Sequence, residues 1–241
     1  MAEQQMPKVK GVVDIVFLLD VTGSMGPCID GLKANINTFV DVLTTKSANN
    51  DSPVKDWRAK VVGYRDFELT DYPPFEDNPF VNDVEPLRAQ LAAQHADGGG
   101  DEPESLLDAL YKVATMGETA RGETPDPGKW RDMSEAKRVV VVFTDASYKP
   151  EMVLPEARGG RLDDVKTAIT SNKVILSIFA PDLPCYHDLA AIDKSELEPI
   201  EDTGAGYPEA LSRYTQDQEN FKQTMIMLAK TVSQPTPTET L

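Results

Sequence analysis

The chain has 241 residues, of which 40% are hydrophobic, so it is long and apolar enough to fold into one large α/β domain. Its 40 acidic and 24 basic side chains give a formal net charge of −16. This charge argues against nucleic acid and anionic membranes as partners, because both attract Lys and Arg.

Targeting and redox signals are weak in this sequence. The N-terminal segment MAEQQMPKVKG has no apolar signal-peptide core, and no stretch is long enough to span a bilayer. The two cysteines, Cys28 and Cys185, are too few for a disulfide framework and fit no zinc-binding spacing. We therefore expect a reduced, cytoplasmic protein.

Strands are predicted from apolar runs that are rich in β-branched residues. Three such runs are typical of central strands in a parallel sheet, where both faces are buried. These runs are Val12–Leu19, Val139–Phe143 and Val174–Ala180. A weaker strand is predicted at Ala59–Tyr64, and short edge strands at Pro79–Val81 and Leu197–Ile200.

Apolar side chains at helical spacing fill the segments between the strands. The stripes run over Ile29–Leu43, Val84–Leu91, Leu106–Val113, Leu162–Ile169 and Phe221–Val232. Alternation of strands and helices predicts a doubly wound sheet with helices on both faces. We expect one domain over residues 11–233, with a flexible lead-in at 1–10 and a flexible tail at 234–241.

Polar residues gather where the predicted strands end. The first strand ends at Asp20, and Thr22 and Ser24 follow at alternate positions. Another strand ends at Thr144 and Asp145. In doubly wound sheets, ligands bind beyond the carboxyl ends of the strands, at the switch in strand order. We therefore expect these side chains to lie together.

Two further loops add candidate residues to this end of the sheet. The segment GGGDEPES, residues 98–105, places Asp101 behind three glycines that allow tight bends. The loop after Tyr64 adds the weaker candidates Arg65, Asp66 and Glu68. The collection consists of carboxylates and hydroxyls, which are the ligands that hard divalent cations such as Mg²⁺ prefer. The alternative is that Asp20, Thr22 and Ser24 only cap the following helix.

Five segments in chain order resemble the von Willebrand factor A family. VFLLDVTGSM is similar to its metal-ion-dependent adhesion site motif, Asp-x-Ser/Thr-x-Ser, and GYRDF, GGGDEPESLLDAL, VVVFTDAS and EDTGAGY continue the likeness. The resemblance covers nearly the whole chain. It implies a doubly wound, mostly parallel sheet with one short antiparallel edge strand.

The resemblance also implies a metal site and a non-enzymatic role. Asp20, Thr22 and Ser24 match the ligands of the first loop, and Asp145 matches the aspartate of the third. Asp101 stands where threonine is usual, as in bacterial-type members with a GGGD signature. This extra carboxylate should tighten cation binding and weaken the attraction of the cation for an acidic ligand.

The expected function is that of an adaptor or regulatory module. It would bind Mg²⁺, or else Mn²⁺ or Ca²⁺, and a protein partner would supply an acidic side chain to the metal. The loops at the site would form a rim around it that includes Met25, Arg65, Gly99, Glu102 and Ser147. The sequence names neither the partner nor the oligomeric state.

Three other interpretations remain open. A haloacid-dehalogenase-type phosphatase would use Asp20 as its nucleophile, but its second aspartate, the general acid, is replaced here by Thr22. A Cys/His hydrolase is disfavoured because His187 and Cys185 have a spacing seldom used for catalysis. A bound metal could also have only a structural role, in which it holds the loops together.

The segment Met116–Arg138 is either a partner-specific insertion or a disordered one.

Overall fold

The computed structural model describes residues 11–44, 54–69, 71–99, 102–202, 204–217, 219 and 222, with the backbone alone over 36–44. The expected lead-in and tail lie outside the described residues. The last predicted stripe does so too, at Phe221, Met225, Leu228 and Val232.

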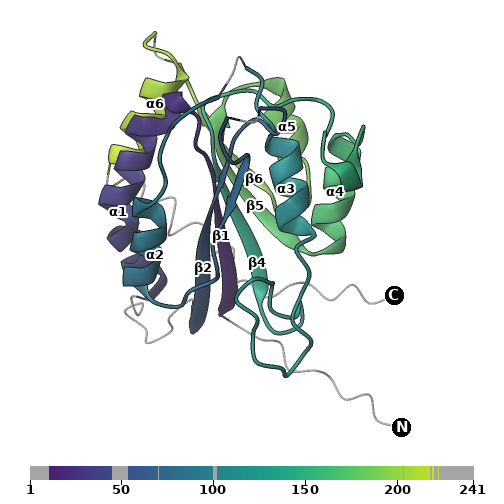
Figure 1. Cartoon of the computed structure of the whole chain (residues 1–241). Coiled ribbons are helices and arrows are strands. Elements are labelled where there is room, and N and C mark those ends of the chain that lie inside the picture. The colour runs from purple at the N-terminus through teal and green to yellow at the C-terminus, as the bar shows by residue number, and fades with distance from the viewer. Residues whose placement is uncertain are drawn as a thin grey trace.

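A six-stranded sheet forms the centre of the molecule (Figure 1). Its strands are β1 (Val12–Asp20), β2 (Asp56–Tyr64), β3 (Phe75–Asp77), β4 (Lys137–Phe143), β5 (Val174–Pro181) and β6 (Glu196–Ile200). They lie in the order β3-β2-β1-β4-β5-β6, and all neighbours are parallel except β3, which runs antiparallel to β2. The predicted fold class and its antiparallel edge strand are confirmed.

Of the two edge strands predicted from the sequence, one forms and the other does not. The strand expected at Leu197–Ile200 lies within β6. The strand expected at Pro79–Val81 is wrong, because Val81 makes only an isolated bridge to Ala59. The edge strand is instead β3, which pairs with the end of β2 through Phe75, opposite Tyr64.

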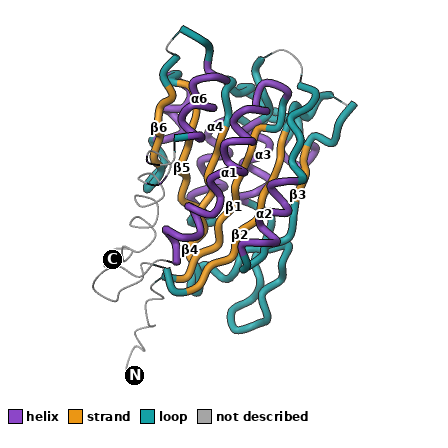
Figure 2. The backbone as a smooth tube through the Cα atoms, turned by 90° about the vertical axis from the view of Figure 1, so that its left-hand side faces the viewer, coloured by secondary structure: helices purple, strands orange, loops and turns teal. Residues whose placement is uncertain are grey.

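Helices cover both faces of the sheet (Figures 1 and 2). One face carries α1 (Gly26–Thr44), α2 (Val84–Ala92) and α6 (Tyr207–Gln216); the other carries α3 (Leu106–Ala114), α4 (Leu162–Ser171) and α5 (Pro184–Ala190). Side chains of β1 alternate between two cores, with Phe17 and Leu19 on the α1 side and Val16 and Leu18 on the α3 side. No helix in the described part of the chain is long and apolar enough to cross a membrane.

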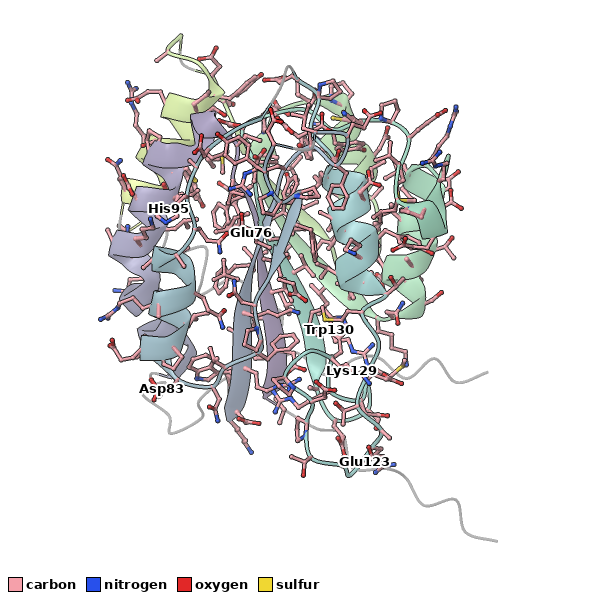
Figure 3. The ribbon with its side chains drawn as sticks, viewed as in Figure 1. Glu76, Asp83, His95, Glu123, Lys129 and Trp130 are labelled. Atoms are coloured by element: carbon pink, nitrogen blue, oxygen red, sulfur yellow. The ribbon has the colours of Figure 1, made fainter. Side chains whose placement is uncertain are left out.

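The insertion at 116–138 is ordered and packs at the amino ends of the strands. Its Trp130 side chain is completely buried and donates a hydrogen bond to the Val113 carbonyl at 3.0 Å. Arg58 of β2 donates to the carbonyls of Asp126 and Lys129 at 3.2 and 3.1 Å. Figure 3 shows Lys129 and Trp130 in the lower half of the molecule and Glu123, also of the insertion, below them. The insertion is therefore far from the carboxyl ends of the strands.

The strand order places the switch point between β1 and β4. From β1 the chain continues to β2 on one side, and it later returns to β4 on the other side. Asp20 ends β1, and Thr144 directly follows β4. The residues singled out in the sequence therefore come from the two strands that border the switch.

Candidate metal centre

Asp20 holds the centre of the candidate site with a completely buried carboxylate. Its Oδ1 accepts hydrogen bonds from the amide and the hydroxyl of Thr22, at 3.0 and 2.7 Å. Its Oδ2 accepts one from the hydroxyl of Thr144 at 2.8 Å. Burial raises the pKa of Asp20, and these bonds lower it only in part. All of these donors are neutral groups.

The glycine loop lies directly against the loop that follows β1. The Gly23 amide donates to the Gly98 carbonyl at 3.0 Å. Gly99 has a φ of +89°, and a Cβ at this position would lie 2.9 Å from the Cβ of Thr22. Glycine is therefore required both for the backbone conformation and for the close approach. Asp101 lies outside the described residues, so its role as a ligand stays a prediction.

Asp145 brings a second carboxylate to this place. Its side chain is buried, and its Oδ2 has no hydrogen-bond partner. Burial, and then the charge of Asp20, raise the pKa of Asp145 to about 6, while the nearby hydroxyl of Ser24 lowers it in part. The structure thus brings Asp20, Thr22, Ser24 and Asp145 together, as the sequence predicted for these four residues.

Glu104, three residues beyond Asp101, supplies a third buried carboxylate. Its side chain is 4% exposed, and its Oε2 has no hydrogen-bond partner. Two backbone hydrogen bonds fix this loop to the third one: the Glu104 amide donates to Ser147 at 2.9 Å, and the Lys149 amide donates to Glu104 at 2.8 Å. Burial, followed by the charges of Asp20 and Asp66, raises the pKa of Glu104 to about 8.

Lys149 is the cation beside Glu104, but it is occupied elsewhere. Its Nζ lies 2.6 Å from Asp66 and 2.6 Å from Glu68. Asp66 also accepts a hydrogen bond from the hydroxyl of Ser105 at 3.2 Å. Burial opposes ionisation of Asp66, but the Lys149 ammonium and the other donors prevail and lower its pKa. Lys149 therefore pairs with the outer carboxylates, and the inner three, Asp20, Asp145 and Glu104, form no ion pair with any described residue.

Two of the residues expected at the rim require correction. Met25 is completely buried and belongs to the core on the α1 side. Arg65 is also buried, and its guanidinium ties the loop after β2 to the loop before the glycines. It forms an ion pair with Glu76 and donates to the carbonyls of Pro73, Asp97 and His95. Figure 3 labels Glu76 and His95 at the two ends of this link.

The other three expected rim residues lie at the surface. Glu102 is exposed, and Gly99 and Ser147 are half-buried. The loop of Glu102 also carries Glu104, and the loop of Ser147 also carries Asp145. Gly99 itself lies close to Thr22. Their contact with a partner stays a prediction.

The described residues fit a hard divalent cation. The donors are carboxylates and hydroxyls, which such cations prefer. Two buried oxygens, Asp145 Oδ2 and Glu104 Oε2, lack partners, and unpaired buried polar groups of this kind are costly. Within the described ranges, no three Asp, Glu, His or Cys side chains form a cluster that could hold a metal by themselves. Hydroxyls and water would therefore complete the coordination, as is common for Mg²⁺.

We predicted no ligand role for Thr144, Glu104 or Lys149, although Thr144 was expected to lie with the other polar residues at the strand ends. Thr144 directly precedes Asp145, and its position at the end of a predicted strand was a usable signal. Glu104 belongs to the quoted GGGDEPES segment, but its burial depends on backbone pairing with a loop more than forty residues away. Nothing in the local sequence indicates such a contact.

Comparison with known proteins places this arrangement in a known fold. No protein-family model and no curated protein matches the sequence. Solved structures do match: proximal thread matrix protein 1 from the mussel byssus at a TM-score of 0.54 and 15% identity, the SpRpn10 VWA domain at 0.52 and 11%, and the pilus adhesin SpaC from Lactobacillus rhamnosus GG at 0.51 and 12%.

The coverage of these matches is uneven. They include 92%, 87% and 91% of this chain, respectively. The chain spans 49% of the mussel protein and 31% of the pilus adhesin, but 98% of the SpRpn10 VWA domain. At these identities the likeness concerns the fold, and the chain has the fold of a von Willebrand factor A domain.

Proposed function

We propose that the chain is a protein-interaction module whose binding face is completed by a divalent cation. The observation that carries this proposal is the Asp145 Oδ2 atom, which is buried without a partner beside the buried Asp20. A cation at this place would neutralise both carboxylates and satisfy the unpaired oxygen. Burial of such charges without compensation is unfavourable.

The proposed ligands are Asp20, Thr22, Ser24 and Asp145, together with Asp101 from outside the described residues. Some of them would act directly and others through water. Mg²⁺ is the expected ion, and Mn²⁺ or Ca²⁺ could replace it. When bound, the ion supplies an electrophilic centre for an outside oxygen.

The partner would contribute a Glu or Asp side chain to this centre. Thr22 and Ser24 are neutral donors, so they leave the cation some attraction for an outside carboxylate. Asp101 would reduce that attraction. The fold supports a recognition role, since one protein of the same fold is a pilus adhesin. That protein is much longer than this chain, so its activity is not transferred as a whole.

The phosphatase alternative receives less support. Asp20 is completely buried, and both of its carboxylate oxygens accept hydrogen bonds. A nucleophile must reach the phosphorus atom of its substrate, so this setting does not favour attack. Metal-dependent turnover of a phosphomonoester that Asp20→Asn abolishes in a folded protein would restore this alternative.

Calorimetry tests the cation site. Protein stripped with EDTA and then titrated with Mg²⁺ should show one saturable site, and Asp20→Asn should remove it. Asp14→Asn is not a suitable control, because Asp14 forms part of the folded framework. Glu68→Gln serves better, since Glu68 is exposed and lies in the outer carboxylate group. Equal Mg²⁺ binding by wild type and Asp20→Asn would refute the site.

A second experiment separates recognition from a structural staple. Peptides that carry Asp or Glu side chains are screened with Mg²⁺ and with EDTA, on wild type, Thr22→Ala and Ser24→Ala. A recognition site should lose peptide affinity in these variants while the melting temperature changes little. If the metal has only a structural role, the variants should have a lower melting temperature, and their folded fraction should bind the peptides as wild type does.

A further inference from the structure

Glu104 is a buried acidic side chain that the ligand set above does not use. Its side chain is 4% exposed, and its Oε2 is buried without a hydrogen-bond partner. Another buried acid, Asp108 of α3, has an evident structural role, because its Oδ1 accepts from the amides of Val153 and Leu154 at 2.8 and 2.9 Å. Asp108 Oδ2 also lacks a partner, so the feature that distinguishes Glu104 is its place beside the glycine loop.

The position of Glu104 points toward the candidate metal centre. The Cβ position of Gly99 lies 3.6 Å from Glu104 Oε1 and 2.9 Å from the Cβ of Thr22. The glutamate and the proposed ligand Thr22 therefore both lie close to Gly99 of the glycine loop. The backbone bonds of Glu104 to Ser147 and Lys149 hold it next to the loop of Asp145.

Among the described residues, the cations nearest to Glu104 form their ion pairs with other carboxylates. Lys149 forms its ion pairs with Asp66 and Glu68, each at 2.6 Å. Arg65 forms its ion pair with Glu76 and donates its other hydrogens to carbonyl groups. Burial of a carboxylate without its own ion pair is unfavourable, and a bound cation would compensate it.

We propose that Glu104 is a further carboxylate of the metal centre, which holds a water molecule of the bound cation and balances its charge from the second loop. We place Glu104 outside the direct ligands, since within the described residues no three Asp, Glu, His or Cys side chains are grouped to hold a metal. Mg²⁺ also tends to keep several waters. This inference rests on the proposed function, since it assumes that the cation is bound beside Asp20.

Glu104→Gln tests the inference, because it removes the charge and keeps the size. We expect its Mg²⁺ dissociation constant to rise about 10- to 100-fold, the range typical of groups that orient metal ligands. Its melting temperature in EDTA should change little, because Gln keeps the size of the side chain and Glu104 Oε2 has no hydrogen-bond partner to lose. A residue with a purely structural role would show the reverse: a lower melting temperature and unchanged affinity.

Two controls and a second variant make the outcome decisive. Glu68→Gln and Asp108→Asn remove an exposed and a buried carboxylate outside the centre, and both should bind Mg²⁺ within about twofold of wild type. Glu104→Asp keeps the charge and should lose less affinity than Glu104→Gln. The role of Glu104 is overturned if Glu104→Gln binds Mg²⁺ with wild-type affinity, or if both Glu104 variants lose the same affinity. In either case Asp20→Asn should still fail to bind, so the cation site itself would stand. Absence of Mg²⁺ binding by wild type overturns the proposed function itself.

Discussion

The two ends of β1 each carry an aspartate that is completely buried, and their surroundings differ in one respect. Asp14, near the start of the strand, forms ion pairs with Arg58 at 2.6 Å and Arg131 at 2.7 Å. Its Oδ2 also accepts a hydrogen bond from the Arg131 amide at 2.8 Å. Asp20, at the end of the strand, is bound by hydroxyls and an amide instead.

The neighbours of the two aspartates extend this difference. Around Asp14, Arg131 also pairs with Asp56, and Arg138 pairs with Glu118 of the insertion. Around Asp20, the buried ionisable side chains include the carboxylates Asp145 and Glu104, and the charge of the buried Arg65 lowers the pKa of Asp20 without forming an ion pair with it. Buried charges need compensation wherever they lie. At the amino end of β1, arginines provide this compensation. At the carboxyl end of β1, a bound cation would provide it.

The largest effect is expected at the amino end. Asp14→Asn leaves Arg58 and Arg131 buried without their shared anion, so it should lower the free energy of unfolding by about 3–5 kcal/mol. Urea denaturation in EDTA measures this loss. The same comparison for Asp20→Asn in EDTA should show little loss or a gain. Similar losses at both ends would remove the distinction between them.

A smaller effect is expected from Asp145→Asn at the carboxyl end. In EDTA this variant should be at least as stable as wild type, because it removes a buried carboxylate that lies near Asp20. With Mg²⁺ at about 100 times the wild-type dissociation constant, wild type should gain about 2.7 kcal/mol and the variant much less. Paired denaturation curves in EDTA and Mg²⁺ provide the measurement. A variant that is less stable than wild type in EDTA would show that Asp145 is held by interactions within the protein.

A pH dependence is expected in the cation-free protein. Burial and the charge of Asp20 raise the pKa of Glu104 to about 8 and that of Asp145 to about 6. A carboxyl group with a raised pKa binds its proton more tightly in the folded state. Its contribution to stability is complete below its unfolded-state pKa and disappears as the pH rises through the folded value.

Melting temperatures in EDTA should therefore fall between pH 5 and pH 8, and excess Mg²⁺ should reduce that fall. A change of 1 kcal/mol corresponds to about 2–4 °C for a domain of this size. Glu104→Gln in EDTA should flatten the dependence at its upper end. Melting temperatures that rise steadily across this window would contradict the proposed charge deficit.

The smallest change in stability is expected for Ser24→Ala. Ser24 is exposed and lies outside the core, so its removal should alter the free energy of unfolding by no more than about 0.5 kcal/mol. Mg²⁺ affinity should nevertheless fall, because a proposed ligand is lost. Calorimetry and denaturation on the same sample compare the two quantities. Unchanged affinity would remove Ser24 from the ligand set.

Much of the fold could be predicted because its central strands have a strong local signal. β1, β4 and β5 are nearly uninterrupted apolar runs, and burial on both faces requires that composition. The short elements lack such a signal. β3 has three residues, and α5 and α6 have few apolar positions, so their formation depends on packing against the rest of the chain.

The candidate site was predictable to a similar extent. Asp20, Thr22, Ser24 and Asp145 lie where strands end, and strand ends can be located from the sequence. Met25 and Arg65 were misplaced at the rim because their burial depends on tertiary contacts: Met25 packs in the core, and Arg65 bonds to carbonyls of other loops. Glu104 was overlooked for the same reason, since the loop contacts that bury it are distant in the sequence.

The central claim is that the carboxyl end of the sheet is completed by a cation and the amino end is not. Equilibrium unfolding of wild type and Asp20→Asn, each in EDTA and in excess Mg²⁺, tests it most directly. We expect Mg²⁺ to raise the free energy of unfolding of wild type and to leave that of Asp20→Asn unchanged. If Mg²⁺, Mn²⁺ and Ca²⁺ all leave wild type unchanged, or if Mg²⁺ stabilises both proteins equally, the claim is contradicted.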